Sequence, residues 1–205
     1  TGVDCGGSCL LVCKSEYKPL SVVSTKAIKT GEGKYDVIVL ISNPNPKSAP
    51  KFINLEINLY DDTGKNFRSI QGSVPGFTGE IIPIYNRGIE AKNISNITVR
   101  LSDYEMYKSS GSYDIKLKNF SYVKNTNTTD IDAFYASPYK DDIKENFVSL
   151  LVAYNSLGNI IGFSEFTVPG LVHDKTSEIF ISLPYVVEGD IASLRFVPLL
   201  MKYEK

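Results

Sequence analysis

Apolar and polar residues alternate with a period of two over residues 53–59. The apolar positions of this run are Ile53, Leu55, Ile57 and Leu59, and the polar positions between them are Asn54, Glu56 and Asn58. Such alternation is typical of a β-strand with one buried side and one side facing solvent. Residues 37–41 are apolar throughout and precede a loop with Pro44 and Pro46, which predicts a central strand. The turn residues at 61–64 then predict a hairpin into residues 67–74.

The same criteria predict about six or seven strands in each half of the chain, and helical patterns are scarce. In the first half the expected strands cover residues 21–29, 37–41, 53–59, 67–74, 80–85 and 96–102. In the second half they cover residues 113–124, 130–136, 147–154, 160–168, 177–183 and 191–197. Short strands separated by polar turns are typical of antiparallel sandwiches. The sequence therefore predicts an all-β fold of two tandem immunoglobulin-like antiparallel β-sandwiches.

The two halves also match each other at an offset of 94 residues, which indicates an internal duplication. The matching pairs are Asp36 with Asp130, Pro44 with Pro138, Tyr60 with Tyr154, Gly64 with Gly158, and Val74-Pro75-Gly76 with Val168-Pro169-Gly170. After one inserted residue, Arg100 corresponds to Arg195 and Leu101 corresponds to Phe196. Solenoid repeats have periods of roughly 20 to 50 residues, so a repeat of this length is a domain.

The duplication sets the expected domain boundaries. We expect a cysteine-rich N-terminal segment at residues 1–17, a first sandwich at 18–103, a linker at 104–112 and a second sandwich at 113–205. A linker this short predicts that the two sandwiches touch.

One outer face differs between the two copies. The positions of Asn54, Glu56 and Asn58 in the first copy are taken in the second copy by Val148, Leu150 and Val152. Three apolar residues in place of three polar ones predict that this face of the second copy is covered. Its cover is either the C-terminal segment Leu199-Leu200-Met201 or a contact with the other domain or another subunit.

The overall charge gives little indication of a charged partner. The chain of 205 residues has a formal net charge of −1, with acidic and basic residues interspersed. A balance of this kind supplies no basic surface for nucleic acid or for an anionic membrane. No apolar run approaches the length that crosses a bilayer. Because Thr1 is not an initiator, we expect that a signal peptide, a membrane anchor or other residues precede it.

All three cysteines, Cys5, Cys9 and Cys13, lie close to the N-terminus. Clustering of this kind suggests a small disulfide-linked element in an exported protein. Three thiols cannot all pair within one chain, so either a fourth cysteine precedes this sequence, or one thiol is free or bridges to another subunit. Zinc is the competing interpretation, but the spacing lacks the Cys-x2-Cys pairs and the histidines that zinc sites use.

Two stretches resemble known families. Residues 1–9, Thr-Gly-Val-Asp-Cys-Gly-Gly-Ser-Cys, resemble the end of the Val-Asp-Cys-Gly-Gly-x-Cys-x-x-Cys motif of many bacterial surface proteins, although three residues rather than two separate Cys9 from Cys13. Residues 54–65 are similar to the Leu-Tyr-Asp…Gly core of small extracytoplasmic β-sandwich domains of the FxLYD type. The resemblance implies a cell-surface location and an N-terminal membrane anchor, and it implies no activity.

Residues that catalysis or metal binding requires are few. His173 is the only histidine, and no Gly-x-Ser-x-Gly elbow accompanies it. The acidic pairs at 61–62 and 141–142 are explained as turn and loop residues, outside any EF-hand pattern. We therefore predict no catalytic residue, no metal site and no cofactor.

Four tripeptides fit the N-glycosylation pattern, with acceptors at Asn93, Asn96, Asn119 and Asn127. In most bacteria these sites would not be modified. In an archaeal or eukaryotic protein, the pair at Asn93 and Asn96 would mark an exposed loop.

These features predict a non-enzymatic structural or adhesive protein of the cell surface, with protein partners or self-assembly into an extracellular assembly or filament. The alternative is an extracytoplasmic ligand-binding module that recognises a glycan or a peptide. Candidates to line its cleft are the tyrosines near the linker, Tyr104, Tyr107, Tyr113 and Tyr122. Tyrosines at such positions also serve as packing between domains.

Overall fold

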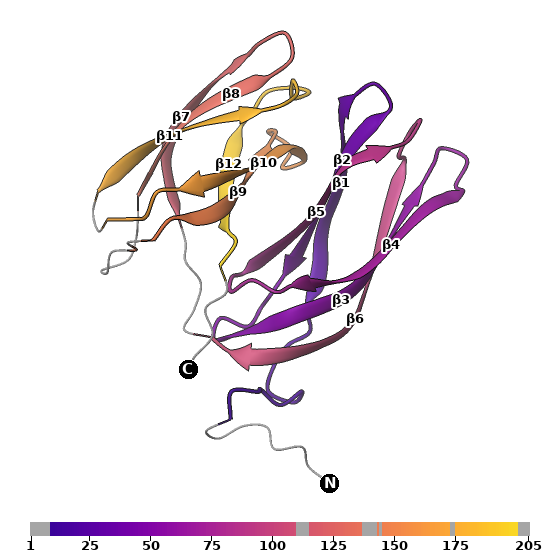
Figure 1. The fold of residues 1–205 in the computed structure, drawn as a ribbon, viewed down its shortest axis with the longest axis vertical. Coiled ribbons are helices and arrows are strands. Elements are labelled where there is room, and N and C mark those ends of the chain that lie inside the picture. The colour runs from indigo at the N-terminus through magenta and orange to yellow at the C-terminus, as the bar shows by residue number, and fades with distance from the viewer. Residues whose placement is uncertain (1–8, 110–114, 137–142, 144, 173–174, 201–205) are drawn as a thin grey trace. The chain divides into compact units, whose positions relative to one another are not determined.

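The computed structural model describes residues 9–109, 115–136, 143, 145–172 and 175–200 (Figure 1). These residues form strands and no helix. The strands of the first half are β1 (Ser21–Gly31), β2 (Lys34–Ser42), β3 (Ser48–Tyr60), β4 (Asn66–Pro75), β5 (Ile81–Glu90) and β6 (Asn96–Lys108). Those of the second half are β7 (Lys116–Lys124), β8 (Thr129–Ala136), β9 (Phe147–Tyr154), β10 (Ile160–Val168), β11 (Thr176–Leu183) and β12 (Ser193–Pro198). The all-β prediction is confirmed, and each predicted strand is present.

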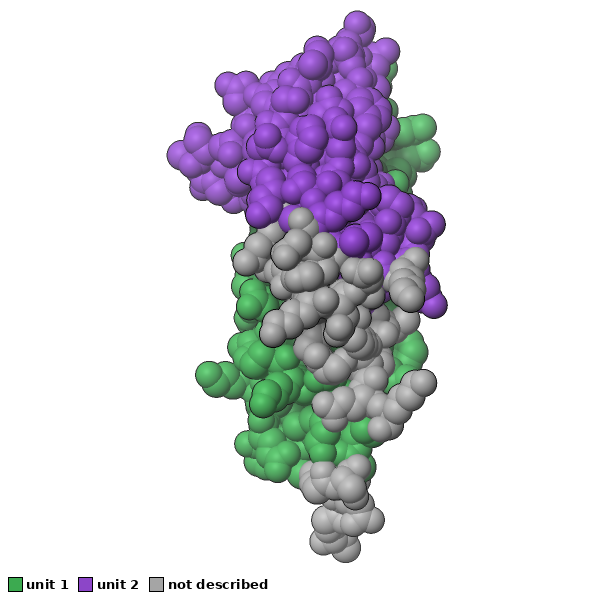
Figure 2. All heavy atoms as spheres, turned by 90° about the vertical axis from the view of Figure 1, so that its left-hand side faces the viewer, with its two compact units in different colours: residues 1–112, 201–205 green, residues 113–200 purple. Residues whose placement is uncertain are grey.

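The chain divides into two compact units (Figure 2). Unit 1 comprises Thr1–Ser112 with Met201–Lys205, and unit 2 comprises Tyr113–Leu200. The predicted linker is partly wrong, because residues 104–108 are the last five residues of β6. They remain in the sheet because Tyr107 pairs with Ala49 and Met106 pairs with Pro50. Met106 is also fully buried in the core of unit 1.

The strands pair antiparallel and in the same order in both units. In unit 1 the two three-stranded sheets have the orders β1-β2-β5 and β4-β3-β6. In unit 2 the equivalent sheets are β7-β8-β11 and β10-β9-β12. The irregularities of pairing are repeated as well. The register of β4 with β3 skips Phe67, and the register of β10 with β9 skips Ile161 at the equivalent place. The sequence repeat therefore corresponds to a repeated backbone.

The pairing of the last strand corrects the sequence alignment. Asn96 of β6 pairs with Tyr60 of β3, and Ser193 of β12 pairs with Tyr154, the counterpart of Tyr60. By this register Arg100 corresponds to Val197, two residues beyond the predicted Arg195. Leu101 likewise corresponds to Pro198 rather than to Phe196. The reason is the longer loop before β12, which covers residues 184–192 where unit 1 has only residues 91–95.

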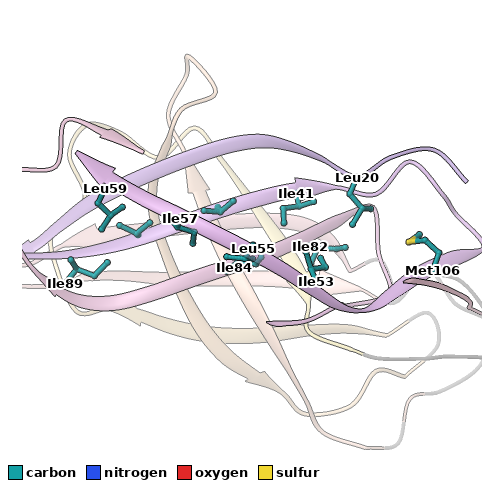
Figure 3. Packing of buried hydrophobic residues seen from close by; sticks show 12 residues of the cluster. Leu20, Ile41, Ile53, Leu55, Ile57, Leu59, Ile82, Ile84, Ile89 and Met106 are labelled. Carbon is teal, nitrogen blue, oxygen red and sulfur yellow. The ribbon is translucent and has the colours of Figure 1, made fainter. Parts of the chain in front are cut away.

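The core of unit 1 lies between its two sheets (Figure 3). Apolar residues at alternate positions of β3 meet residues of β2 and β5, as period-two patterning requires. The fully buried members from these strands include Val37, Val39, Ile41, Ile53, Ile57, Leu59 and Ile82. In unit 2 the rings of Tyr135 on β8 and Phe196 on β12 pack edge to face at 6.1 Å, which joins its two sheets. Each unit is therefore sandwich-like.

The β3–β4 turn and its counterpart between β9 and β10 use the same hydrogen bonds. The Asp61 carboxylate accepts from the backbone N–H groups of Thr63 and Lys65, both at 3.0 Å. The Asn155 side chain accepts from Leu157 and Asn159 at the same distance. Gly64 and Gly158 follow with φ of 80° and 76°, a conformation that glycine adopts without strain. The acidic pair at 61–62 is thus a turn, as predicted.

Candidate functional site

The cysteine-bearing N-terminal segment lies along the edge of β6. The Lys108 N–H donates to Leu10 O, and the Val12 N–H donates to Met106 O, both at 2.8 Å. Leu11 forms a bridge with Tyr107 between these two bonds. Cys13 is disulfide-bonded, and the Cys9 thiol is free and half-buried. Cys5 lies outside the described residues.

The N-terminal segment, β3 and β6 together line one part of a groove on unit 1. This part, the aromatic part, has a volume of about 440 Å³. Its lining residues are Lys14, Lys51, Phe52, Asn54, Asp103, Tyr104, Glu105 and Tyr107. Phe52 and Asn54 are on the outer side of β3, because the alternate residues Ile53 and Leu55 face the core. Phe52 is 52% exposed, so this aromatic residue is accessible to solvent.

Charged groups hold the ring of Tyr107 in this aromatic part. The Tyr107 hydroxyl donates to Glu105 Oε2 at 3.0 Å. The Lys51 ammonium lies 5.8 Å from the centre of the Tyr107 ring, within the range of a cation–π contact. The hydrogen bond to Glu105, burial and the negative charge of Glu105 raise the pKa of Tyr107 above its ordinary value. Tyr107 therefore stays a neutral hydrogen-bonding group at physiological pH.

Tyr104 fixes the chain that leads into β1. Its hydroxyl oxygen accepts a hydrogen bond from the Leu20 N–H at 2.9 Å. Its ring packs against Tyr17 at a centroid distance of 6.1 Å. Burial, together with nearby Tyr104 and Glu105, raises the pKa of Tyr17. Tyr104 thus has a structural role in addition to lining the groove.

The groove continues along the same outer face as a second part, the amide part, of about 400 Å³. Its lining residues are Asn54, Leu55, Glu56, Gln71, Gly72, Arg100 and Ser102. Asn54 lines both parts, so they adjoin at this residue. Gln71 Nε2 donates to Glu56 Oε1 at 3.1 Å, and Ser102 Oγ donates to Asn54 O at 3.0 Å. We call the two parts together the unit 1 groove. Its groups can hydrogen-bond a polar ligand and stack on an apolar ring face.

The four predicted cleft tyrosines do not all meet at this groove. Tyr104 and Tyr107 line it. Tyr122 is on β7 of unit 2, where its hydroxyl donates to Asp190 Oδ1 at 3.1 Å. Tyr113 lies outside the described residues.

The predicted apolar interface residues lie on β9 of unit 2, and only one of them is exposed. Leu150 and Val152 are 0% exposed, whereas Val148 is 41% exposed. The Leu199 N–H donates to Val148 O at 2.9 Å, so the C-terminal segment continues beside β9. Met201 lies outside the described residues.

The four sequon asparagines are all described. Asn96, Asn119 and Asn127 are exposed, and Asn93 is half-buried in the loop before β6. The acidic pair at 141–142 and His173 lie outside the described residues. Within the described part of the chain, no cluster of His, Cys, Asp or Glu could hold a metal ion. In that same part no helix is long and apolar enough to cross a membrane.

Comparison with known proteins adds no assignment. The sequence matches no protein-family model, and no curated protein is similar to it.

Sequence reasoning does not identify most of the groove. The alternating pattern places Asn54, Glu56 and Asn58 on a solvated face, which is correct for the strand but gives no indication of a hollow. Lys14 and Lys51 carry no signal, because the residues they meet lie far away on β6. Phe52 is the one clue in the sequence, because it falls on the polar side of the alternating run.

Proposed function

We propose that this chain is a non-enzymatic structural or adhesive protein of the cell surface, which makes contacts through the unit 1 groove. The observation that carries the proposal is the groove itself. It combines an exposed aromatic ring at Phe52, a fixed ring at Tyr107 and a row of amide, hydroxyl and charged groups. Concave surfaces that place a few oriented polar groups beside aromatic rings are typical of binding sites.

We further propose that each unit is an immunoglobulin-like sandwich. Two antiparallel three-stranded sheets with a shared core and short turns support this interpretation. A rigid scaffold of this kind suits adhesion, because it holds a binding face without rearrangement.

An exported location is part of the proposal. The disulfide at Cys13 supports it, because disulfides persist in oxidising compartments outside the cytosol. The resemblance of residues 1–9 to a bacterial surface-protein motif points the same way.

Bead adhesion tests the adhesive role. Beads that carry the full chain are applied under flow to surfaces coated with mucin, collagen, bacterial cell wall or the chain itself. We expect attachment to at least one coating and its loss in a Phe52→Ser, Tyr107→Ser double variant. The matched control is Leu157→Ser, at an 81% exposed turn position of unit 2, which should attach like the wild type. Attachment no better than bare beads, or equal attachment by the groove variant, would overturn the proposal.

A second candidate function is a subunit of a covalent extracellular assembly. The observation that favours it is the free Cys9 thiol next to a segment that β6 holds in place. Light scattering across a dilution series, with and without reductant, tests this idea. A disulfide-linked oligomer that Cys9→Ser abolishes would support it, and a monomer under oxidising conditions would exclude it.

A further inference from the structure

We infer that the unit 1 groove binds a neutral oligosaccharide in an extended conformation. This inference rests on the proposed adhesive function and adds the chemical class of the ligand. Four properties of the groove carry it: its length, its charge balance, its aromatic rings and its contrast with unit 2.

The groove is long and shallow rather than a closed pocket. On β6 its lining extends from Arg100 to Tyr107. At the rise of a β-strand this distance is roughly 20 Å. An extended chain of several sugar rings fits such a length, whereas a single small molecule would contact only part of it.

Charges in the groove balance. Lys14, Lys51 and Arg100 supply three positive groups, and Glu56, Asp103 and Glu105 supply three negative ones. A site for a sulfated or phosphorylated polymer would show an excess of positive charge. The balance therefore favours an uncharged ligand that carries many hydroxyl groups.

The side chains match the two surfaces of a sugar. A pyranose ring has an apolar face of C–H groups and an edge of hydroxyls. Phe52 and Tyr107 offer aromatic faces for the first. Asn54, Gln71 and Ser102 offer both donors and acceptors for the second, which hydroxyl groups require.

Unit 2 shows how the same face looks without these groups. By strand register, Asn54, Glu56 and Arg100 correspond to Val148, Leu150 and Val197. Three polar groove residues are thus apolar in the second copy on an otherwise repeated backbone. Leu150 and Val197 are buried in unit 2, whereas Asn54 and Arg100 are exposed in unit 1. The face of unit 1 is therefore open to a ligand where its counterpart in unit 2 is largely covered.

NMR titration of the full chain, labelled with ¹⁵N, tests the inference. The probes are cellohexaose, maltohexaose and chitohexaose as neutral oligosaccharides, a sulfated heparin hexasaccharide, and a hexaglycine peptide. We expect at least one neutral hexasaccharide to shift backbone amides of β3, β4 and β6 around the groove. In Phe52→Ser the affinity for it should fall about three- to tenfold, as loss of one aromatic contact predicts. Phe52 is exposed, so this variant should keep the fold.

The matched control is Val148→Ser, at the position of unit 2 that corresponds to Asn54, which should leave the affinity unchanged. The inference is wrong if no neutral oligosaccharide shifts these amides at millimolar concentration, or if only the sulfated or peptide probe does. If the beads still attach through the groove, the proposed adhesive function stands with another class of ligand. If neither the NMR shifts nor the groove-dependent attachment is observed, the groove is rejected as a binding site.

Discussion

Replacing Gly76 with alanine should destabilise unit 1 by about 2–4 kcal/mol. Gly76 follows β4 and is buried, and its N–H donates to Lys51 O at 2.9 Å. A Cβ atom added at this position would lie 2.0 Å from Pro50 O and 2.7 Å from Pro50 C. Both atoms belong to the backbone of β3, so no side-chain rotation can relieve the clash.

The magnitude follows from the movement that alanine would require. Ordinary contacts of a Cβ atom begin at 3.4 Å, so the Pro50 carbonyl and Gly76 must separate by more than an ångström. That separation would break the hydrogen bond to Lys51, worth about 1 kcal/mol. It would also disturb the tightly packed end of β3, and overpacking of this kind costs about 1–3 kcal/mol or more. The melting temperature of unit 1 should fall by more than about 10 °C.

Two other glycines provide controls. A Cβ atom added at Gly72 would have no other atom within 4 Å, and the φ of Gly72 is ordinary, so Gly72→Ala should be neutral or slightly stabilising. Gly170, the counterpart of Gly76, has a φ of 61°, so Gly170→Ala should cost unit 2 about 1 kcal/mol through backbone strain.

Hydrogen-exchange mass spectrometry in increasing urea measures these effects, because it reports on each unit separately. Fluorescence of tryptophan cannot serve, since the chain contains none. If Gly76→Ala lowers the stability of unit 1 no more than Gly72→Ala does, the close approach of Gly76 to Pro50 is refuted.

Three further predictions concern polar groups. Ser149 is fully buried in unit 2, and among the described residues its hydroxyl has no hydrogen-bond partner. Ser149→Ala should therefore raise the stability of unit 2 against urea by about 1 kcal/mol. A lower urea midpoint would contradict this prediction. Tyr185 Oη accepts a hydrogen bond from the Phe163 N–H at 2.8 Å and donates one to Phe163 O at 3.0 Å. Tyr185→Phe removes both bonds and should lower the stability of unit 2 by about 2 kcal/mol in the same assay. An unchanged urea midpoint would refute this prediction. The hydrogen bond from Thr63, followed by those from the backbone, lowers the pKa of Asp61 below its ordinary 3.8. Since the folded pKa is the lower one, the turn is stabilised above the unfolded pKa and loses this stabilisation as pH falls through the folded pKa. An NMR titration of the Asp61 carboxylate should show the depression, and in Asp61→Asn the acid sensitivity of the turn should disappear, as Asn155 already makes the same bonds in unit 2.

The strands were predictable because their signals are local. Alternation in β3, the apolar run in β2 and the turn residues at 61–64 each act within a few positions. The end of β6 could not be predicted in this way. Ser109, Ser110 and Gly111 indicate a linker, but pairing with the distant strand β3 holds residues 104–108 in the sheet. The match of Arg100 with Arg195 failed for a related reason. The alignment of β12 with β6 is shifted by two residues, and a shift of two leaves every side chain on the same face of a strand. Periodicity alone therefore could not detect the longer loop before β12.

The groove was predictable only in part, because it depends on pairing between distant strands. Tyr104 and Tyr107 were recognised as candidates, but their neighbours Lys51 and Phe52 were not. The pairing of β3 with β6 shifts register between Pro50 and Ile53 and again between Ile53 and Leu55. Such irregularities bend a sheet and re-aim its side chains, and no local pattern in the sequence reveals them. The hollow beside Phe52 is therefore a tertiary feature.

The two copies show which features the backbone requires and which it leaves free. Both units contain the turn after β3 or its counterpart, the skipped residue in the next strand and the Val-Pro-Gly tripeptide. The glycine of this tripeptide has a different role in each unit. Gly76 permits close approach to Pro50, whereas Gly170 adopts a positive φ. The outer face that contains Asn54 and Glu56 differs between the copies, because Leu150, the counterpart of Glu56, is 0% exposed whereas Asn54 is exposed. The same backbone thus carries polar residues on the open face of unit 1 and apolar residues on the largely covered face of unit 2, and a binding surface on unit 1 needs no change in the scaffold that carries it.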